Sequence, residues 1–161
     1  LYTKYITDLR PMMMENGVKL VHLGQTNGLP QTLIYELAKS MEMTADNDGL
    51  ILGLALNYSG RVEIEDVVKK IALEFKDGKI GYEDIGQRFI SEHIYAPQIG
   101  ETDLLIRTSG EMRISNFLLW QIAYAELYFT NVLWPDFKRT DIEEAIIAYS
   151  QRERRFGNLD S

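Results

Sequence analysis

The sequence has no cysteine, which excludes disulfides, zinc–thiolate sites and a cysteine nucleophile. It also has no lysine-rich tract, and its formal net charge of −7 argues against the cationic face that general nucleic-acid binders need. No apolar run approaches the roughly 20 residues that cross a bilayer, and no signal-peptide pattern opens the chain. We therefore expect a cytoplasmic protein with no nucleic-acid partner and at most peripheral membrane association.

What the chain does contain is typical of a globular protein. Hydrophobic residues make up 45% of its 161 residues and charged residues 25%. A chain of this length can bury a core, and the sequence shows no internal repeat, low-complexity tract or linker. We expect a single domain over residues 1–161. Because the chain opens on Leu1 within a helical pattern, we also expect further sequence upstream.

Apolar residues alternate between helix-like and strand-like patterns along the chain. Helical spacing covers residues 2–13, 33–41, 64–75, 82–94 and 142–149. Pro11 is expected to kink or restart the first of these helices, and Thr140 with Glu143 to form a capping box before the last. Strands are predicted at residues 18–24, 50–56, 104–106 and 127–132.

The run Leu50–Leu56 is almost entirely apolar, as a parallel strand covered on both faces requires. Strands and helices that alternate with short loops predict an α/β fold: a mostly parallel sheet covered by helices on both faces. In such sheets ligands bind beyond the carboxyl ends of the strands. Two polar clusters, Asn57–Arg61 and Arg107–Ser115, follow predicted strands and are candidates to line one crevice.

The segment Asp103–Asn116 carries the strongest chemical signal. A short apolar strand leads into a polar turn with Arg107 and Arg113, and a helix is expected to begin near Ser115. N–H groups at a helix start carry partial positive charge, and guanidinium groups bind phosphate oxygens in pairs, so the turn predicts a phosphate site. Surface salt bridges for the arginines and a simple helix cap for Ser115 are the alternative on local sequence alone.

This segment, continued through Tyr128 and by Leu133–Phe137, closely resembles the signature of the cis-prenyltransferases, the family of undecaprenyl diphosphate synthase. Asn57–Arg61 resembles the family's Asn-Tyr-Gly-Gly-Arg segment, with Ser59 in place of the first glycine. The resemblance covers about Val18 to Gly157 and corresponds to the carboxyl-terminal portion of a family member. It implies the family's α/β fold, here without the amino-terminal part.

The resemblance also implies roles for individual residues. Arg107, Arg113 and Ser115 match positions that hold the diphosphate of isopentenyl diphosphate, and Ile114 lines the same segment. Glu126 matches a magnesium ligand, and Mg²⁺ accepts one carboxylate together with phosphate and water oxygens. From the residues alone, Glu126 would lie where the helix from Ser115 ends, and an arginine partner or plain exposure is the simpler explanation.

Three further positions are weaker candidates for substrate binding. Arg155 and Gly157 resemble an Arg-x-Gly tail that reaches the partner's active site in dimeric members, so a homodimer is expected; a cationic helix end is the alternative. Arg61 either supports the crevice or pairs with Glu63 or Glu65. Five aromatic residues near the motif are expected to pack in the core or in a dimer interface rather than around a substrate: Trp120, Tyr124, Tyr128, Phe129 and Trp134.

One family motif is missing. The histidine and methionine followed by Asp-Gly-Asn-Gly-Arg, which supplies the catalytic aspartate, occurs nowhere in the sequence, so no catalytic residue is assigned and the chain alone is expected to be inactive. The resemblance implies a Mg²⁺-dependent parent transferase that condenses isopentenyl diphosphate onto an allylic diphosphate such as farnesyl diphosphate. Its cis-polyprenyl product would serve as the bacterial cell-wall lipid carrier. The alternatives are a non-catalytic subunit of a heteromeric cis-prenyltransferase and an unrelated α/β phosphate-binding module.

Overall fold

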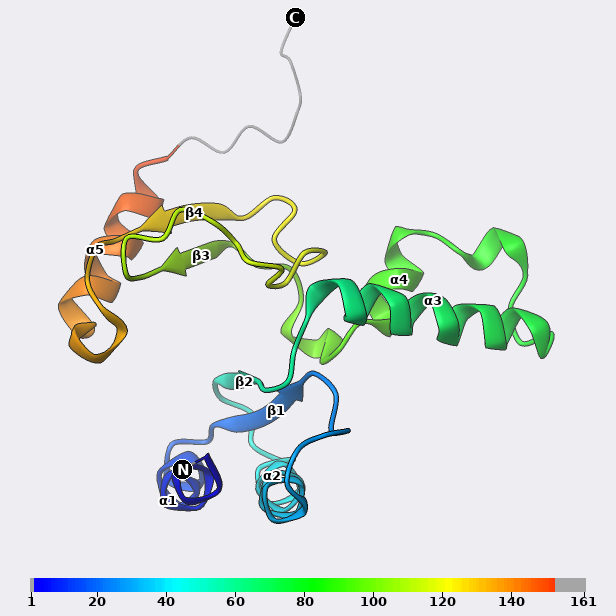
Figure 1. Ribbon diagram of the computed structural model, residues 1–161, viewed down its shortest axis with the longest axis horizontal. Coiled ribbons are helices and arrows are strands. Elements are labelled where there is room, and N and C mark those ends of the chain that lie inside the picture. The colour runs from blue at the N-terminus through cyan, green and yellow to red at the C-terminus, as the bar shows by residue number, and fades with distance from the viewer. Residues whose placement is uncertain (1, 153–161) are drawn as a thin grey trace, which may run out of the picture. The chain divides into compact units, whose positions relative to one another are not determined.

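The computed structural model describes residues 2–152 of the chain (Figure 1). The chain divides into two compact units, Leu1–Ile99 and Gly100–Ser161, which we describe separately as unit 1 and unit 2. The expectation of a single domain stays a prediction. No helix in the described range is long and apolar enough to cross a membrane.

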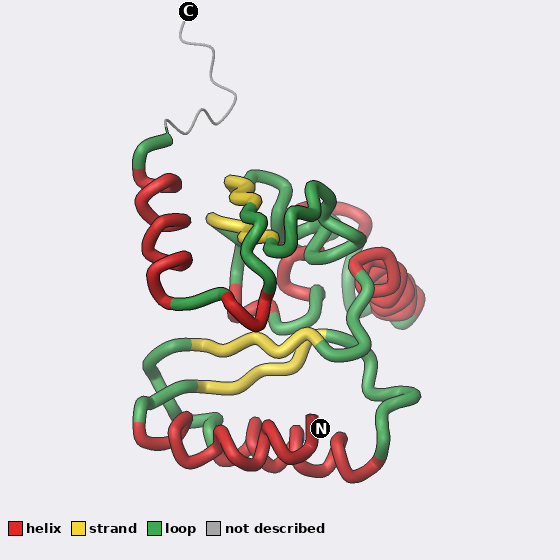
Figure 2. Tube along the Cα trace, turned by 60° about the vertical axis from the view of Figure 1, so that its left-hand side comes forward, coloured by secondary structure: helices red, strands yellow, loops and turns green. Residues whose placement is uncertain are grey.

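Unit 1 alternates helices and strands: α1 (Tyr2–Glu15), β1 (Lys19–Leu23), α2 (Gln31–Met43), β2 (Ile51–Ala55), α3 (Gly60–Lys76) and α4 (Gln87–His93). Short 3₁₀ turns span Tyr82–Asp84 and Pro97–Ile99. Strands β1 and β2 pair in parallel, with Lys19 opposite Ile51 and Leu23 opposite Ala55. Figures 1 and 2 show α1 and α2 side by side along one face of this pair.

The core of unit 1 forms where α1 and α2 meet β1. Its buried residues recur at helical spacing on the two helices and point inward from the strand: Ile6, Met13, Leu20, Leu33 and Leu37. Helix α1 continues through Pro11 and does not restart there, whereas the expected kink stays a prediction. Proline removes one N–H from the helix, but Ile6 and Met13 anchor the turns on either side of it in the same core.

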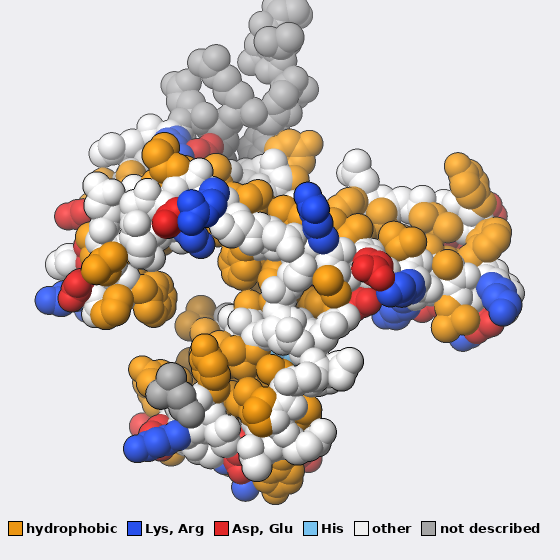
Figure 3. Space-filling view, in the orientation of Figure 1, with side chains coloured by type: hydrophobic (Ala, Val, Ile, Leu, Met, Phe, Trp, Pro, Cys, Tyr) orange, Lys and Arg blue, Asp and Glu red, His pale blue; other side chains and the backbone are white. Residues whose placement is uncertain are grey.

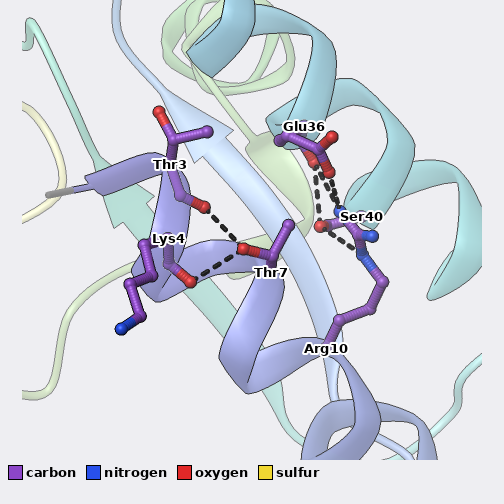
Figure 4. Close-up of polar contacts among 6 residues, drawn as sticks. All are labelled: Thr3, Lys4, Thr7, Arg10, Glu36 and Ser40. Carbon is purple, nitrogen blue, oxygen red and sulfur yellow. Dashed lines mark hydrogen bonds and ion pairs between the residues drawn. The ribbon is translucent and has the colours of Figure 1, made fainter.

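A polar clamp also joins α1 to α2. Arg10 on α1 donates from Nε to Ser40 Oγ at 3.0 Å and from Nη2 to Glu36 Oε2 at 2.5 Å (Figure 4). Ser40 is completely buried, and its Oγ in turn donates to the Glu36 carbonyl at 2.9 Å. The clamp therefore satisfies polar groups that the helix packing has removed from water.

Unit 2 contains a second parallel pair, β3 (Leu104–Arg107) with β4 (Glu126–Phe129), followed by a 3₁₀ turn at Trp134–Asp136 and helix α5 (Arg139–Ser150). Leu104 lies opposite Glu126 and Arg107 opposite Phe129. Helices combined with parallel strand pairs confirm the predicted α/β class. The described strands form two two-stranded sheets, one in each unit.

The helix expected from Ser115 is wrong. Residues 115–124 form a series of turns, with positive φ at Ser115 (48°), Asn116 (63°) and Leu118 (48°). A right-handed helix requires negative φ at every residue, so three positive values so close together exclude it. Glu126 is consequently the first residue of β4 rather than the end of a helix.

Helix α5 begins differently from its prediction. Asp141 Oδ2 accepts a hydrogen bond from the Lys138 N–H at 2.6 Å and so caps the first turn, while Glu143 pairs with Arg139 at 2.7 Å. The expected Thr140–Glu143 capping box is therefore wrong, because the helix starts before Thr140. Of the expected apolar stripe, only Ala145 is fully buried.

Large hydrophobic side chains remain exposed on the surface of both units (Figure 3). In unit 1 they include Leu50 before β2 and Val68 on α3, and in unit 2 Ile146 on α5. Ile51 and Leu52 of β2 are each 36% exposed, although the sequence of this strand predicted cover on both faces. The apolar surfaces of α3, α5 and β2 are thus only partly covered by their own units.

Candidate functional site

A cavity of about 240 Å³ lies in unit 2 at the carboxyl end of β3. It is formed by β3, by the turn that follows it and by the 3₁₀ turn after β4. Eight residues line it: Leu105, Ile106, Arg107, Thr108, Arg113, Ile114, Phe117 and Trp134. Three of the four predicted substrate-binding residues, Arg107, Arg113 and Ile114, therefore meet in one cavity.

Arg107 is the last residue of β3, and its side chain lines the cavity. Its Nε is buried and has no hydrogen-bond partner among the described residues. A buried donor without an acceptor costs roughly 1–3 kcal/mol, and more when the group is charged. A cationic group left unsatisfied beside a cavity favours an anionic ligand.

Arg113 lies across the turn and is more exposed than Arg107. Its guanidinium forms a salt bridge with Glu111, so the simple surface pairing considered from the sequence is present for this residue. Such exposed pairs contribute only about 0–1 kcal/mol. Arg113 can therefore exchange Glu111 for a ligand oxygen at little cost.

The turn between the two arginines is held in shape by β4 and the residues after it. Ser109 N–H donates to the Val132 carbonyl and Gly110 N–H to the Thr130 carbonyl, both at 2.9 Å. Gly110 has φ 67°, and a Cβ there would lie 2.8 Å from Asn131 Oδ1. The left-handed backbone favours glycine at this position, whereas the Asn131 amide lies at the end of a flexible side chain that can move away from a Cβ.

Ser115, the fourth predicted substrate-binding residue, is not part of the cavity lining. It is exposed and has φ 48°, directly after Ile114. The structure thus gathers Arg107, Arg113 and Ile114 and leaves Ser115 beside them in the sequence. The ligand roles of all four residues stay predictions.

Glu126, the predicted magnesium ligand, has an arginine partner. Its Oε2 accepts a hydrogen bond from Arg152 Nη1 at 2.6 Å, and Arg152 also donates to the Leu127 carbonyl at 3.0 Å. No group of three or more acidic, histidine or cysteine residues in the described range is placed to hold a metal. Glu126 fits Mg²⁺ only as a single hard oxygen ligand, with phosphate and water oxygens completing the shell.

The second polar cluster, Asn57–Arg61, lies in unit 1 at the carboxyl end of β2. Ser59 has φ −151° and accepts a hydrogen bond from the Val62 N–H at 3.5 Å, so it caps α3 in an extended conformation that needs no glycine. Arg61 is exposed on the first turn of α3. Because this cluster and Arg107 belong to different units, the shared crevice stays a prediction. Arg155 and Gly157 lie outside the described residues.

A second cavity, of about 360 Å³, lies in unit 1 beside the loop after β1. Asp66 Oδ2 on its wall accepts hydrogen bonds from the Tyr95 hydroxyl and from Gln25 Nε2, the latter at 2.9 Å. The Tyr95 and Gln25 donors lower the pKa of Asp66, and burial together with the Asp66 contact raises the pKa of Tyr95 well above its usual value. The sequence did not predict this cluster, because its members lie far apart along the chain.

Trp134 is the residue of the first cavity that sequence reasoning assigned elsewhere. It was expected in the core or in a dimer interface. It lines the cavity and the residue is 72% exposed, so the core position is wrong, while the interface stays a prediction. Its ring stacks on Phe137 with centroids 5.9 Å apart and an interplanar angle of 13°. The signal available in the sequence was its position in the Leu133–Phe137 segment, where Pro135 favours a fixed turn.

Comparison with known proteins identifies the chain's relatives. A family model described as "Putative undecaprenyl diphosphate synthase" matches residues 1–157. An isoprenyl transferase of Fusobacterium nucleatum is 49% identical over 159 residues, covering 99% of this chain and 66% of the relative. An isoprenyl transferase of Bacillus subtilis is 41% identical over 156 residues, covering 97% and 60%. The chain thus spans 60–66% of the length of these two relatives.

Solved structures agree with these matches. Lavandulyl diphosphate synthase from Lavandula x intermedia, in complex with dimethylallyl diphosphate, superposes with a TM-score of 0.91 at 31% identity, covering 98% of this chain and 68% of that one. A probable undecaprenyl diphosphate synthase from Campylobacter jejuni gives 0.84 at 27% identity, covering 96% and 70%. Together, the family model, the sequence relatives and the shared fold show that this chain belongs to the undecaprenyl diphosphate synthase family of prenyltransferases.

Proposed function

We propose that this chain binds the isopentenyl diphosphate of a Mg²⁺-dependent cis-prenyltransferase, which condenses it onto an allylic diphosphate such as farnesyl diphosphate. The observation that carries the proposal is Arg107: in a member of this family, its buried Nε has no partner among residues 2–152, and it lies beside a cavity that Arg113 also lines. The product would be a cis-polyprenyl diphosphate for the bacterial cell-wall lipid carrier, made in the cytoplasm.

In this proposal the arginines position the nucleophilic substrate. Arg107 and Arg113 donate hydrogen bonds to its diphosphate, Ile114 lines the pocket, and the Ser115 hydroxyl adds a donor at the rim. The isopentenyl double bond attacks the allylic carbon, the allylic diphosphate leaves as pyrophosphate, and a proton is lost. The contribution of these four residues is orientation and charge neutralisation, since none of them takes part in the bonds that change.

Glu126 would hold magnesium through its carboxylate, with the diphosphate supplying further oxygens. Bound Mg²⁺ supplies charge neutralisation at the diphosphate. The Glu126 and Arg152 side chains are 28% and 38% exposed, so their separation costs little. The catalytic aspartate is expected upstream, and in a homodimer Arg155 and Gly157 would reach the partner's site, with Arg61 supporting the crevice.

The test is a calorimetric titration of isopentenyl diphosphate with and without Mg²⁺. We expect Arg107→Ala and Arg113→Ala each to weaken binding roughly 10- to 100-fold, the range for a lost hydrogen bond to a charged group. Arg139→Ala removes the same charge from an exposed pair outside the cavity and serves as the matched control. Unchanged binding in both cavity variants, or tighter binding of a nucleotide, would contradict the proposal.

A second candidate is a non-catalytic subunit of a heteromeric cis-prenyltransferase, which would stabilise a catalytic partner without binding substrate itself. Retention of Arg107, Arg113, Ser115 and Glu126 favours substrate binding instead, since a purely structural subunit needs none of them. A prenyl-transfer assay on the complete protein distinguishes the two: turnover without a second protein supports the enzyme. The family match leaves no place for an unrelated phosphate-binding module.

A further inference from the structure

The lining of the cavity in unit 2 combines two chemically different kinds of residue. Arg107, Thr108 and Arg113 offer hydrogen-bond donors, whereas the remaining residues are apolar: Leu105, Ile106, Ile114, Phe117 and Trp134. An inorganic phosphate or pyrophosphate needs only the donors. Apolar residues in the same lining favour a ligand in which a hydrocarbon group is attached to the anion.

Trp134 stands out among the apolar lining residues. It is 72% exposed, whereas the other four apolar lining residues are half-buried. Its indole therefore has most of its surface available for a further contact, and aromatic rings contribute large contact areas at low entropic cost.

The Trp134 ring is also held in place before any ligand arrives. It opens the 3₁₀ turn Trp134–Asp136, in which the Asp136 N–H donates to the Leu133 carbonyl at 2.9 Å. Pro135 fixes one backbone angle of this turn, and Phe137 stacks on the indole with its ring nearly parallel. A contact made by such a preorganised ring loses little to ordering.

We propose that Trp134 covers the hydrocarbon part of the ligand whose diphosphate Arg107 and Arg113 hold. Trp134 is then a substrate-selecting residue rather than a core or interface residue, and it lets the cavity distinguish an organic diphosphate from inorganic pyrophosphate. This inference rests on the proposed function, because it takes the diphosphate ligand as given.

The experiment compares two ligands on matched variants. Isopentenyl diphosphate and inorganic pyrophosphate are titrated into the wild-type protein, Trp134→Ala, Trp134→Phe and Arg107→Ala. We expect Trp134→Ala to weaken the binding of isopentenyl diphosphate about tenfold, or about 1.4 kcal/mol. The affinity for pyrophosphate should change by less than about twofold. Trp134→Phe should keep most of the preference for isopentenyl diphosphate over pyrophosphate, and Arg107→Ala should weaken the binding of both ligands.

Fluorescence gives a second readout. These 161 residues contain two tryptophans, so in a Trp120→Phe variant Trp134 is the only one of them that contributes indole emission. Isopentenyl diphosphate should change that emission at saturation more than pyrophosphate does.

The outcomes separate the inference from the function on which it rests. If wild-type protein binds neither ligand, or Arg107→Ala binds both as tightly as wild type, the proposed function fails. A second outcome is that Arg107→Ala weakens the binding of both ligands, while Trp134→Ala either leaves both affinities unchanged or lowers them equally. In that case only the role of Trp134 is overturned. If Trp134→Ala leaves both affinities unchanged but the protein no longer forms its oligomer, Trp134 is an interface residue and its proposed role is likewise overturned. Trp134→Phe, which keeps an aromatic ring, decides the case if the alanine variant does not fold.

Discussion

Arg152 Nη1 donates to Glu126 Oε2 at 2.6 Å, so the carboxylate predicted to bind magnesium is already paired with a cation. The two residues lie at the start of β4 and just after α5, 26 positions apart along the chain. A guanidinium and a magnesium ion compete for the same oxygens of a carboxylate. If Glu126 binds magnesium as we propose, Arg152 competes with the metal for its carboxylate.

This competition predicts that Arg152→Ala strengthens the response to magnesium. Because an exposed pair contributes at most about 1 kcal/mol, we expect up to roughly a fivefold lower Mg²⁺ concentration at half-maximal isopentenyl diphosphate binding. Glu126→Gln should abolish the Mg²⁺ dependence. Titrations at a series of Mg²⁺ concentrations measure both effects, with Arg139→Ala as a control of equal charge; an undiminished Mg²⁺ response in Glu126→Gln would remove Glu126 from the metal site.

The clamp between α1 and α2 predicts a loss of stability in Arg10→Ala. The Arg10 side chain is 13% exposed, and its removal leaves buried Ser40 without one of its partners. We expect the free energy of unfolding to fall by about 1–3 kcal/mol. Arg88→Ala, which removes an exposed pair within α4, should change it by less than about 0.5 kcal/mol. Urea unfolding measures both, and equal effects would argue against the clamp.

Glu63 predicts a larger effect. This side chain is completely buried on α3, where Oε2 accepts from the Tyr58 hydroxyl at 2.6 Å and Oε1 from the Tyr95 N–H at 2.9 Å. Glu63→Ala leaves two donors without this acceptor and should lower the free energy of unfolding by about 2–4 kcal/mol. Glu65→Ala, at an exposed position of the same helix, is the control. A loss no greater than that control would show that water replaces the carboxylate.

Asp66 and Tyr95 predict a pH dependence. Hydrogen bonds from Tyr95 and Gln25 lower the folded pKa of Asp66 below its ordinary 3.8. The stability that this provides is therefore present above about pH 3.8 and lost as pH falls through the lower, folded pKa. Tyr95→Phe removes the larger of the two causes, so the stability difference from wild type should be greatest near pH 7 and shrink below pH 3.8. Urea unfolding at several pH values measures it; a difference that is constant with pH would exclude Asp66 as its source.

Much of the fold could be predicted because its elements show their own periodicity. The stripe through Leu33 and Leu37 identified α2, and the apolar run before Asn57 identified β2. The helix predicted from Ser115 was wrong because the conformation of this segment depends on contacts with residues distant in the sequence. Thr102 N–H donates to the Gln121 carbonyl at 2.9 Å, and such contacts override a helical pattern that is read locally.

The candidate site was predictable to the extent that its residues are neighbours in the sequence. Arg107, Arg113 and Ile114 lie within one motif, and they do line one cavity. Trp134 was expected in the core or a dimer interface rather than at the cavity, because its position depends on a turn that periodicity does not report. The Asp66 cluster was missed for a related reason: its hydrogen bonds join residues 29 and 41 positions apart.

The hydrogen bonds from Ser109 and Gly110 to the carbonyls after β4 make the placement of the two arginines a property of strand register. Arg107 lies opposite Phe129 in the β3–β4 pair. A one-residue slip of β4 would therefore move the Thr130 and Val132 carbonyls that hold the turn, and the side chains of β4 would point to the opposite face of the sheet. A one-residue deletion within β4 should therefore abolish ligand binding even in protein that still folds. The same deletion in the loop between α3 and Tyr82 would leave this register, and with it the cavity of unit 2, unchanged.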